Sequence, residues 1–233
     1  MDHAIVDREQ WLKARLELLS EEKAFNRARD ELSRRRRELP WERVSKSYTF
    51  TGPGGPLTLA DLFGPHSQLI IYHFMLGPDA QEPCKSCSFW ADNFNGIDVH
   101  LAHRDVALTL VSRAPLARIA ALKARFGWTL NWVSSLASDF NFDYGVSFTP
   151  EQVKSGRANY NYREIDNTMG ELPGISVFVR AADGTICHSY SCYARGLDML
   201  NGAYHLLDLV PKGRDERGLP YSMSWLRLRD RYE

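Results

Sequence analysis

Two cysteines separated by two residues, Cys84 and Cys87, are the part of this chain whose types and spacing best suit chemistry. They follow an apolar run, 69–76, and precede a segment, 88–94, with the composition of a helix. The thiolate is the reactive form of cysteine, and the unpaired N–H groups and dipole of a helix N-terminus stabilise an anion. Two intervening residues let the second thiol reach the first. The spacing predicts a redox dithiol in which Cys84 attacks and Cys87 resolves.

Two cationic residues are candidates for binding substrate beside this pair. Lys85 directly follows Cys84 and adds positive potential there. Arg113 follows a second apolar run, 106–111, and sites in such sheets lie at the carboxyl ends of parallel strands. Arg113 also fits an ordinary loop arginine. His73, inside the first apolar run, is either a proton acceptor near the dithiol or a hydrogen-bonded core histidine, and the core role is the commoner one.

The remaining cysteines, Cys187 and Cys192, lie five residues apart with His188 between them. In an extended chain they are ~16 Å apart and point to opposite faces, so we expect two small buried residues and not a second dithiol. A structural zinc site takes four ligands, usually from two cysteine pairs. We therefore expect no metal and no cofactor, although a metal pair or inert thiols at Cys84 and Cys87 remain alternatives.

The composition is that of an ordinary globular protein. The chain has 233 residues, 25% of them charged and 44% hydrophobic, and 29 basic residues balance 29 acidic ones. This balance favours neither nucleic acid nor an anionic membrane as a partner. No apolar run approaches the ~20 residues of a membrane-spanning helix, and the N-terminal residues lack the apolar core of a signal peptide. We expect a cytoplasmic protein.

The chain divides into an arm, a core domain and a tail. Apolar residues recur at helical spacing over 7–38, and Pro40 stops the helix. We assign 1–45 to an N-terminal helical arm, 46–211 to the core domain and 212–233 to a C-terminal tail. The arginine run that ends the helix is interpreted as a solvated helix end, because a cationic last turn suits the helix dipole.

The elements of the core follow the order βαβ and then ββα. The pattern predicts a hairpin around residues 52–55, and after it strand 69–76, the helix that follows Cys84, strand 106–111, helix 115–126, strands 175–180 and 185–190, and helix 197–209. This order resembles the thioredoxin core, an α/β fold with a mixed central sheet flanked by helices. Such folds carry a cis proline that faces the dithiol. The resemblance implies that Pro173, directly before strand 175–180, is cis and contacts substrate.

Motifs along nearly the whole chain are similar to those of an uncharacterised, largely bacterial family of thioredoxin-like proteins. The resemblance implies a thioredoxin-like fold and, by position, a dithiol at Cys84 and Cys87, but no substrate. The matching runs are Tyr72-His73-Phe74-Met75, Cys87-Ser88-Phe89-Trp90-Ala91-Asp92, Val111-Ser112-Arg113-Ala114-Pro115, Trp132-Val133-Ser134-Ser135, Leu172-Pro173-Gly174 and Tyr193-Ala194-Arg195-Gly196-Leu197-Asp198.

A weaker likeness points to the peroxiredoxin branch of the same fold. The early hairpin and Ser138-Asp139 are of that kind. The peroxidatic pattern, however, has Thr or Ser three residues before the cysteine, and Gln81 stands there. This departure weakens the expectation of peroxide reduction.

Three classes of function remain open. The first is a thiol–disulfide oxidoreductase acting on a protein or small-molecule disulfide, with a peroxiredoxin-like thiol peroxidase as its variant. The second is a non-enzymatic binding or assembly protein whose helical arm forms a partner or homodimer surface. The third is a metal-carrying module that uses Cys84, Cys87 and a histidine.

Overall fold

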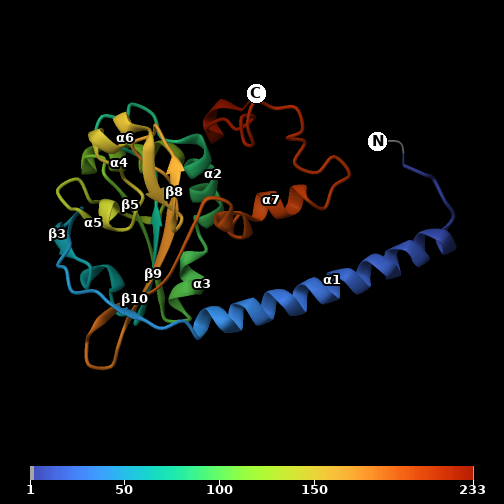
Figure 1. The fold of residues 1–233 in the computed structure, drawn as a ribbon, viewed down its shortest axis with the longest axis horizontal. Helices are drawn as coiled ribbons and strands as arrows, with labels where there is room; N and C mark the ends of the chain where they lie inside the picture. The colour runs from blue at the N-terminus through green and yellow to red at the C-terminus, as the bar shows by residue number, and fades with distance from the viewer. Residues whose placement is uncertain (1–2, 233) are drawn as a thin grey trace. The chain divides into compact units, whose positions relative to one another are not determined.

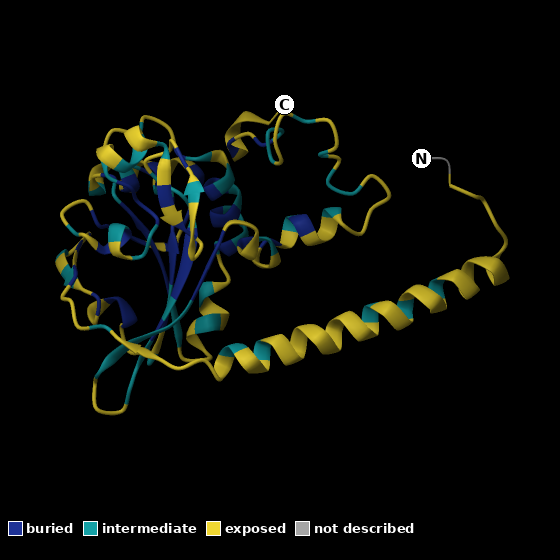
Figure 2. Cartoon of the chain, in the orientation of Figure 1, coloured by how far each residue is buried: buried dark blue, intermediate teal, exposed yellow. Residues whose placement is uncertain are grey.

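The computed structural model describes residues 3–232, and the chain divides into two compact units, Met1–Pro40 and Trp41–Glu233 (Figure 1). The first unit is one uninterrupted helix, α1 (Arg8–Arg37). Asp7 caps its N-terminus by accepting a hydrogen bond from the N–H of Gln10, and four arginines form its last turn. None of its residues is buried, as the colouring of Figure 2 shows.

An eight-stranded mixed sheet forms the centre of the second unit. Its strand order is β1-β10-β9-β4-β5-β6-β2-β3. Strands β4, β5 and β6 run parallel, whereas β9 is antiparallel to β4 and to β10. The order β10-β9-β4-β5 with these directions is that of the thioredoxin-like fold, as predicted. The bounds are β1 (Glu42–Arg43), β2 (Thr49–Gly52), β3 (Gly55–Thr58), β4 (Gln68–His73), β5 (Val106–Ser112), β6 (Asn131–Ser134), β9 (Gly174–Arg180) and β10 (Ile186–Tyr193).

The two faces of the sheet bury separate cores. Tyr72 and neighbouring side chains pack against α2 (Lys85–Phe94) and α4 (Leu116–Phe126). Side chains of alternate β4 residues, Leu69 and Ile71, pack on the other face. There they meet the first hairpin and two short helices, η1 (Asp61–Phe63) and α5 (Phe140–Asp143). Burial on both faces explains why β4 reads as a continuous apolar run. One further helix, α3 (Asp98–Ala102), leads into β5.

The segment between β6 and β9, expected to be irregular, contains further elements. After α5 come α6 (Pro150–Ser155) and a two-stranded hairpin, β7 (Arg157–Tyr160) and β8 (Arg163–Asp166). Asn161 and Tyr162 form its turn with φ of 53° and 64°. Tight hairpin turns need positive φ at both positions and are usually signalled by Asn-Gly. The bulky Tyr162 concealed this turn from the sequence pattern.

The last helix expected over 197–209 is broken in two. A 3₁₀ helix, η2 (Ala194–Leu200), is followed by α7 (Gly202–Leu207). Asn201 between them has extended backbone, and its side chain accepts a hydrogen bond from the N–H of Tyr204. An N-cap of this kind starts a new helix.

Two further sequence expectations about the C-terminal half need correction. Every peptide bond of the described residues is trans, so the expected cis bond at Pro173 is wrong, and this proline fits the start of β9 in the ordinary way. The strand β10 has a bulge between His188 and Tyr190. Cys187, before the bulge, pairs with Val179 of β9, and Cys192, after it, pairs with Ile175. These partners lie four residues apart on β9, which places both cysteines on one face and not on opposite faces.

The C-terminal residues pack on the core. Leu226 and Leu228 are buried, and Arg229 contacts the Asp92 carboxylate of α2 at 3.2 Å. Arg229 begins the last short helix, η3 (Arg229–Arg231). Although this segment is mostly polar, its two buried leucines attach it to the core.

Candidate functional site

The two cysteines meet at the start of α2, as the spacing predicts. Cys84 is the N-cap residue and partly buried, whereas Cys87 lies in the first turn and is fully buried. The two residues come within 3.8 Å of each other, and both thiols are reduced. Ser88 closes the turn by donating hydrogen bonds from its N–H and its hydroxyl to the carbonyl of Cys84, both at 2.9 Å.

The surroundings of Cys84 favour its thiolate. A hydrogen bond from the Cys87 thiol is the main reason why the pKa of Cys84 falls from 9.0 to about 6. Burial opposes this shift, while the backbone N–H groups of Cys87 and Ser86 support it. These N–H groups are among the unpaired donors of the first helical turn. At neutral pH Cys84 is therefore mostly ionised.

Cys87 has the opposite tendency. Burial is the main cause that raises its pKa well above the ordinary value, and the neighbouring Cys84 raises it further. The N–H of Met75 donates to the Cys87 sulfur at 3.4 Å, which holds the thiol in place. The surroundings thus shift the pKa values of the two thiols in opposite directions.

Basic residues from distant parts of the chain hold the loop that precedes Cys84. Arg118 of α4 donates to the carbonyl of Gln81 at 2.9 Å. The Glu82 carboxylate forms ion pairs with Arg125 at 3.1 Å and with Arg231 at 3.0 Å. Both ion pairs are largely exposed, so each adds little to the free energy of unfolding. Their effect is to hold the loop in position.

The three predicted substrate-binding residues lie in three different environments. Pro173 lines a cavity together with Cys87. Lys85 is exposed at the first position of α2. The guanidinium of Arg113 lies 4.4 Å above the ring of Phe142, and its Nε is buried without a hydrogen-bond partner.

His73 is a core residue on the opposite face of the sheet from the dithiol. It is 1% exposed, its Nε2 lies 2.9 Å from the Ser176 hydroxyl, and its ring packs beside Phe140. Burial is the main cause that lowers its pKa to about 3. The core interpretation of His73 is therefore the right one.

Sequence reasoning missed Glu171, which lies two residues before Pro173. A side chain added at Gly77, in the loop that precedes Cys84, would lie 3.7 Å from the carboxyl carbon of Glu171. Burial raises the pKa of Glu171 to about 7; Arg113 lowers it and Cys84 raises it. The sequence held no signal that Glu171 would be buried near Cys84, because a glutamate in a loop segment resembles any exposed glutamate.

Three buried polar atoms near this carboxyl lack a hydrogen bond of ordinary geometry within the described chain, although Ser147 is close enough to the Glu171 carboxylate to lower its pKa. They are Nε of Arg113, Oγ of Ser147 and Oε1 of Glu171. Ser147 and Glu171 face each other in an isolated β-bridge. Buried polar atoms are normally paired, so this cluster is suited to receive a polar ligand or water.

A small cavity opens beside the buried cysteine, and we call it the Cys87 cavity. Its volume is about 230 Å³. Ala194 on its wall has φ of 49°, a conformation that is uncommon for residues other than glycine. Most of its wall is formed by Tyr72, Cys87, Trp90, Pro173, Leu197 and Met223.

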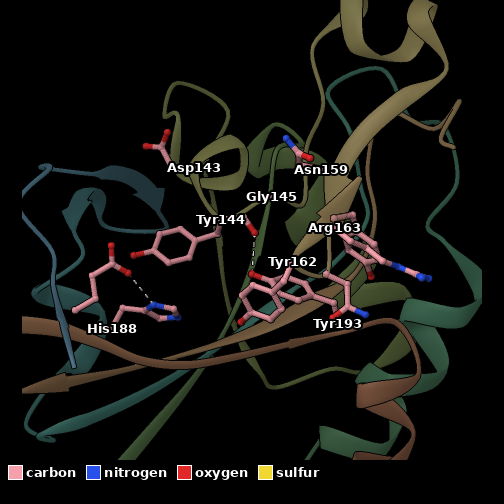
Figure 3. Close-up of a pocket in the computed structure, with 11 residues that line it drawn as sticks. Asp143, Tyr144, Gly145, Asn159, Tyr162, Arg163, His188 and Tyr193 are labelled. Atoms are coloured by element: carbon pink, nitrogen blue, oxygen red, sulfur yellow. Dashed lines mark hydrogen bonds and ion pairs between the residues drawn. The ribbon is translucent and has the colours of Figure 1, made fainter. Parts of the chain in front are cut away.

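A second cavity, of about 440 Å³, is rich in tyrosine (Figure 3). Figure 3 shows Tyr162 beside Tyr193, with Tyr144 and His188 at another end. The Tyr160 hydroxyl, from the wall of this cavity, donates to the carbonyl of Pro173 at 2.6 Å. Tyr160 of this cavity thus holds the backbone of the proline that lines the Cys87 cavity.

The described residues contain neither a membrane-spanning helix nor a cluster of metal ligands. No helix among them is both long and apolar enough to cross a membrane. Residues 3–232 contain no group of three or more His, Cys, Asp or Glu side chains arranged to hold a metal ion.

Peroxiredoxins are among the solved structures similar to this chain, at low sequence identity. Peroxidoxin BcpB from Mycobacterium tuberculosis is 14% identical with a TM-score of 0.47, over 70% of this chain and 94% of that one. Peroxiredoxin Q from Xanthomonas campestris is 16% identical with a TM-score of 0.45, over 71% and 95%. The mitochondrial 2-Cys peroxiredoxin from Plasmodium falciparum is 13% identical with a TM-score of 0.41, over 71% and 94%. Likenesses this distant carry no argument about chemistry.

No curated protein matches the chain. The family resemblance expected from the motifs is confirmed, because a family model matches residues 1–232. The chain belongs to the family described as bacterial protein of unknown function (DUF899).

Proposed function

We propose that this protein is a thiol–disulfide oxidoreductase with Cys84 as nucleophile and Cys87 as resolving thiol. The observation that carries the proposal is the asymmetry of the pair: the pKa of Cys84 is lowered to about 6, while that of Cys87, within 3.8 Å, is raised. A nucleophile that is ionised beside a protonated partner is the arrangement that disulfide exchange requires.

The exchange proceeds in two steps. The Cys84 thiolate attacks one sulfur of a substrate disulfide, whose S–S bond breaks as a mixed disulfide forms, and the departing thiolate takes up the proton of Cys87. The Cys87 thiolate then attacks the Cys84 sulfur and releases the second half of the substrate as a thiolate, which takes a proton from solvent. Two electrons pass to the substrate, and the protein keeps a Cys84–Cys87 disulfide.

Serine variants test this assignment. Mixing reduced protein with 2-hydroxyethyl disulfide should oxidise the dithiol in the parent, give no reaction in Cys84→Ser, and trap a mixed disulfide in Cys87→Ser that mass spectrometry detects. Cys187→Ser, a partly buried cysteine outside the pair, is the matched control and should behave like the parent. A Cys84→Ser protein with full disulfide-reductase activity would refute the proposal.

Peroxide reduction is a second candidate, favoured by the unpaired polar atoms of Arg113, Ser147 and Glu171. The Cys84 thiolate would attack one peroxide oxygen and, with one proton, yield a sulfenic acid and an alcohol or water. Condensation with the Cys87 thiol would then form the disulfide and release water. Peroxide consumption that persists without either cysteine would discard this candidate. Disulfide exchange stays first, because Gln81 occupies the Thr/Ser position of the peroxidatic pattern.

We also propose that α1 mediates contact between two copies of the chain. Trp11, Leu18, Phe25 and Leu32 recur every seven residues and are each about half exposed or more, at 47%, 51%, 67% and 50%. A seven-residue repeat keeps apolar side chains along one side of a helix, as in coiled coils. Light scattering of the purified protein tests this; a monomer at all concentrations would contradict it.

A further inference from the structure

We propose that the Cys87 cavity binds the hydrocarbon chain of a small disulfide that bears a carboxylate. This proposal rests on the disulfide-exchange function proposed above and adds the class of substrate. Three features carry it: the apolar wall of the cavity, its size, and an arginine at its edge.

The wall of the cavity offers little to a polar ligand. The Trp90 indole N–H is already engaged with the carbonyl of Leu197 at 3.0 Å. The Asp198 carboxylate, also on the wall, is bound by Arg214 at 2.9 Å. What remains facing the cavity is chiefly aromatic and aliphatic surface from Trp90, Leu197 and Met223. Such a surface binds hydrocarbon by removing it from water.

The size of the cavity favours a short chain. A volume of about 230 Å³ lies below the ~300–1,000 Å³ of pockets that take drug-sized molecules. Its wall includes Cys87 and Pro173, so a chain lying in it ends beside the dithiol. The occupant is therefore a few methylene groups attached to a reacting sulfur.

Arg195 supplies the charge that selects an anionic occupant. Its side chain is 90% exposed, and its one ion pair with the described residues is a 3.6 Å contact between its Nε and Asp198. Because that contact uses Nε and the side chain is otherwise exposed, the terminal N–H groups of Arg195 are available to another carboxylate. Arginine presents parallel donors that match a carboxylate well.

The chemistry is the exchange already described. The substrate S–S bond breaks, the Cys84–Cys87 disulfide forms, and two substrate thiols leave with the two electrons of the reduced pair, one proton from Cys87 and one proton from solvent. No further oxidant or reductant is needed for one turnover.

A series of three linear disulfides tests the proposal in single-turnover reactions with the reduced protein. They are the disulfides of 6-mercaptohexanoate, of 6-mercaptohexanol and of 2-mercaptoethanol. We expect the hexanol disulfide to react about tenfold faster than the two-carbon one, the factor that burial of roughly two methylene groups yields, and the hexanoate disulfide about fivefold faster again through Arg195. Hexanoate, which has no disulfide, should inhibit the six-carbon reactions and leave the two-carbon reaction unchanged.

Variants separate the charge from the cavity. Arg195→Gln should slow the hexanoate disulfide about fivefold, on the scale of one exposed charge pair, without slowing the hexanol disulfide. Arg217→Gln, an exposed arginine in the tail, is the matched control and should change neither rate. Met223→Trp, which fills the cavity, should slow both six-carbon disulfides and spare the two-carbon one.

The outcomes separate a failure of the substrate class from a failure of the disulfide-exchange function. If no disulfide oxidises the pair, the oxidoreductase function itself fails. If all three disulfides react at equal rates and hexanoate does not inhibit, the substrate class is wrong and the oxidoreductase function stands. The hexanoate competition uses the unaltered protein, so it decides the matter even where Met223→Trp does not fold.

Discussion

Replacing Cys87 by alanine should raise the pKa of Cys84. The Cys87 thiol is the largest cause of the fall in that pKa from 9.0 to about 6. A hydrogen bond to a charged group contributes about 1.5–3 kcal/mol, and one pKa unit corresponds to about 1.4 kcal/mol. Loss of the donor should therefore move the pKa of Cys84 upward by roughly one to two units. Cys87→Ser keeps an O–H donor at the same position and should lie close to the parent.

The assay is the rate of alkylation of Cys84 by iodoacetamide as a function of pH, with the modified peptide identified by mass. The parent rate should reach half its maximum near pH 6, and that of Cys87→Ala about one to two pH units higher. Coincident curves for the parent and Cys87→Ala would refute the argument that the second thiol stabilises the first. A parent curve centred near pH 8.5 would show that the helix start and its neighbours do not hold a thiolate at all.

Further predictions concern stability and assembly. The pKa of Glu171 is raised by burial from 4.5 to about 7, so its stabilising contribution is complete below pH 4.5 and lost as pH rises through 7. Glu171→Gln should thus gain stability relative to the parent between these values, by at most about 3 kcal/mol in urea unfolding; a constant difference at all pH values would contradict the shift. Asn201→Ala removes the cap of α7 and should cost about 1 kcal/mol by the same measurement, and an unchanged midpoint would count against the cap. Trp11→Glu with Phe25→Glu should reduce the mass measured by light scattering, whereas an unchanged mass would place any dimer contact outside α1.

The fold was open to prediction from the sequence because its signals are local. Continuous apolar runs mark β4 and β5 as buried strands, and the order of strands and helices restricts the topology to a few arrangements. The same pattern placed a helix over 88–94, directly after the pair, and with it the expected proximity of Cys84 and Cys87, although α2 itself begins earlier, at Lys85. These features depend on neighbours in the chain, which a single sequence displays.

The surroundings of the site depended on contacts between distant segments. Glu171 lies beside Gly77, 94 positions earlier in the sequence, and Tyr160 reaches Pro173 through a hairpin whose turn carries no glycine. His73 shares a strand with Tyr72 but points to the other face, so its distance from the dithiol was decided by the pleat.

By itself, the sequence determined a mixed sheet and a pair of cysteines near the N-terminus of a helix, because hydrophobic periodicity and residue spacing are properties of the chain alone. Only the tertiary structure decided how the surroundings shift the pKa values of the two thiols, that Pro173 is trans, and which side chains line the Cys87 cavity. The physical reason is that pKa values and cavities arise from burial and from charges brought together across the chain, and no local pattern records them.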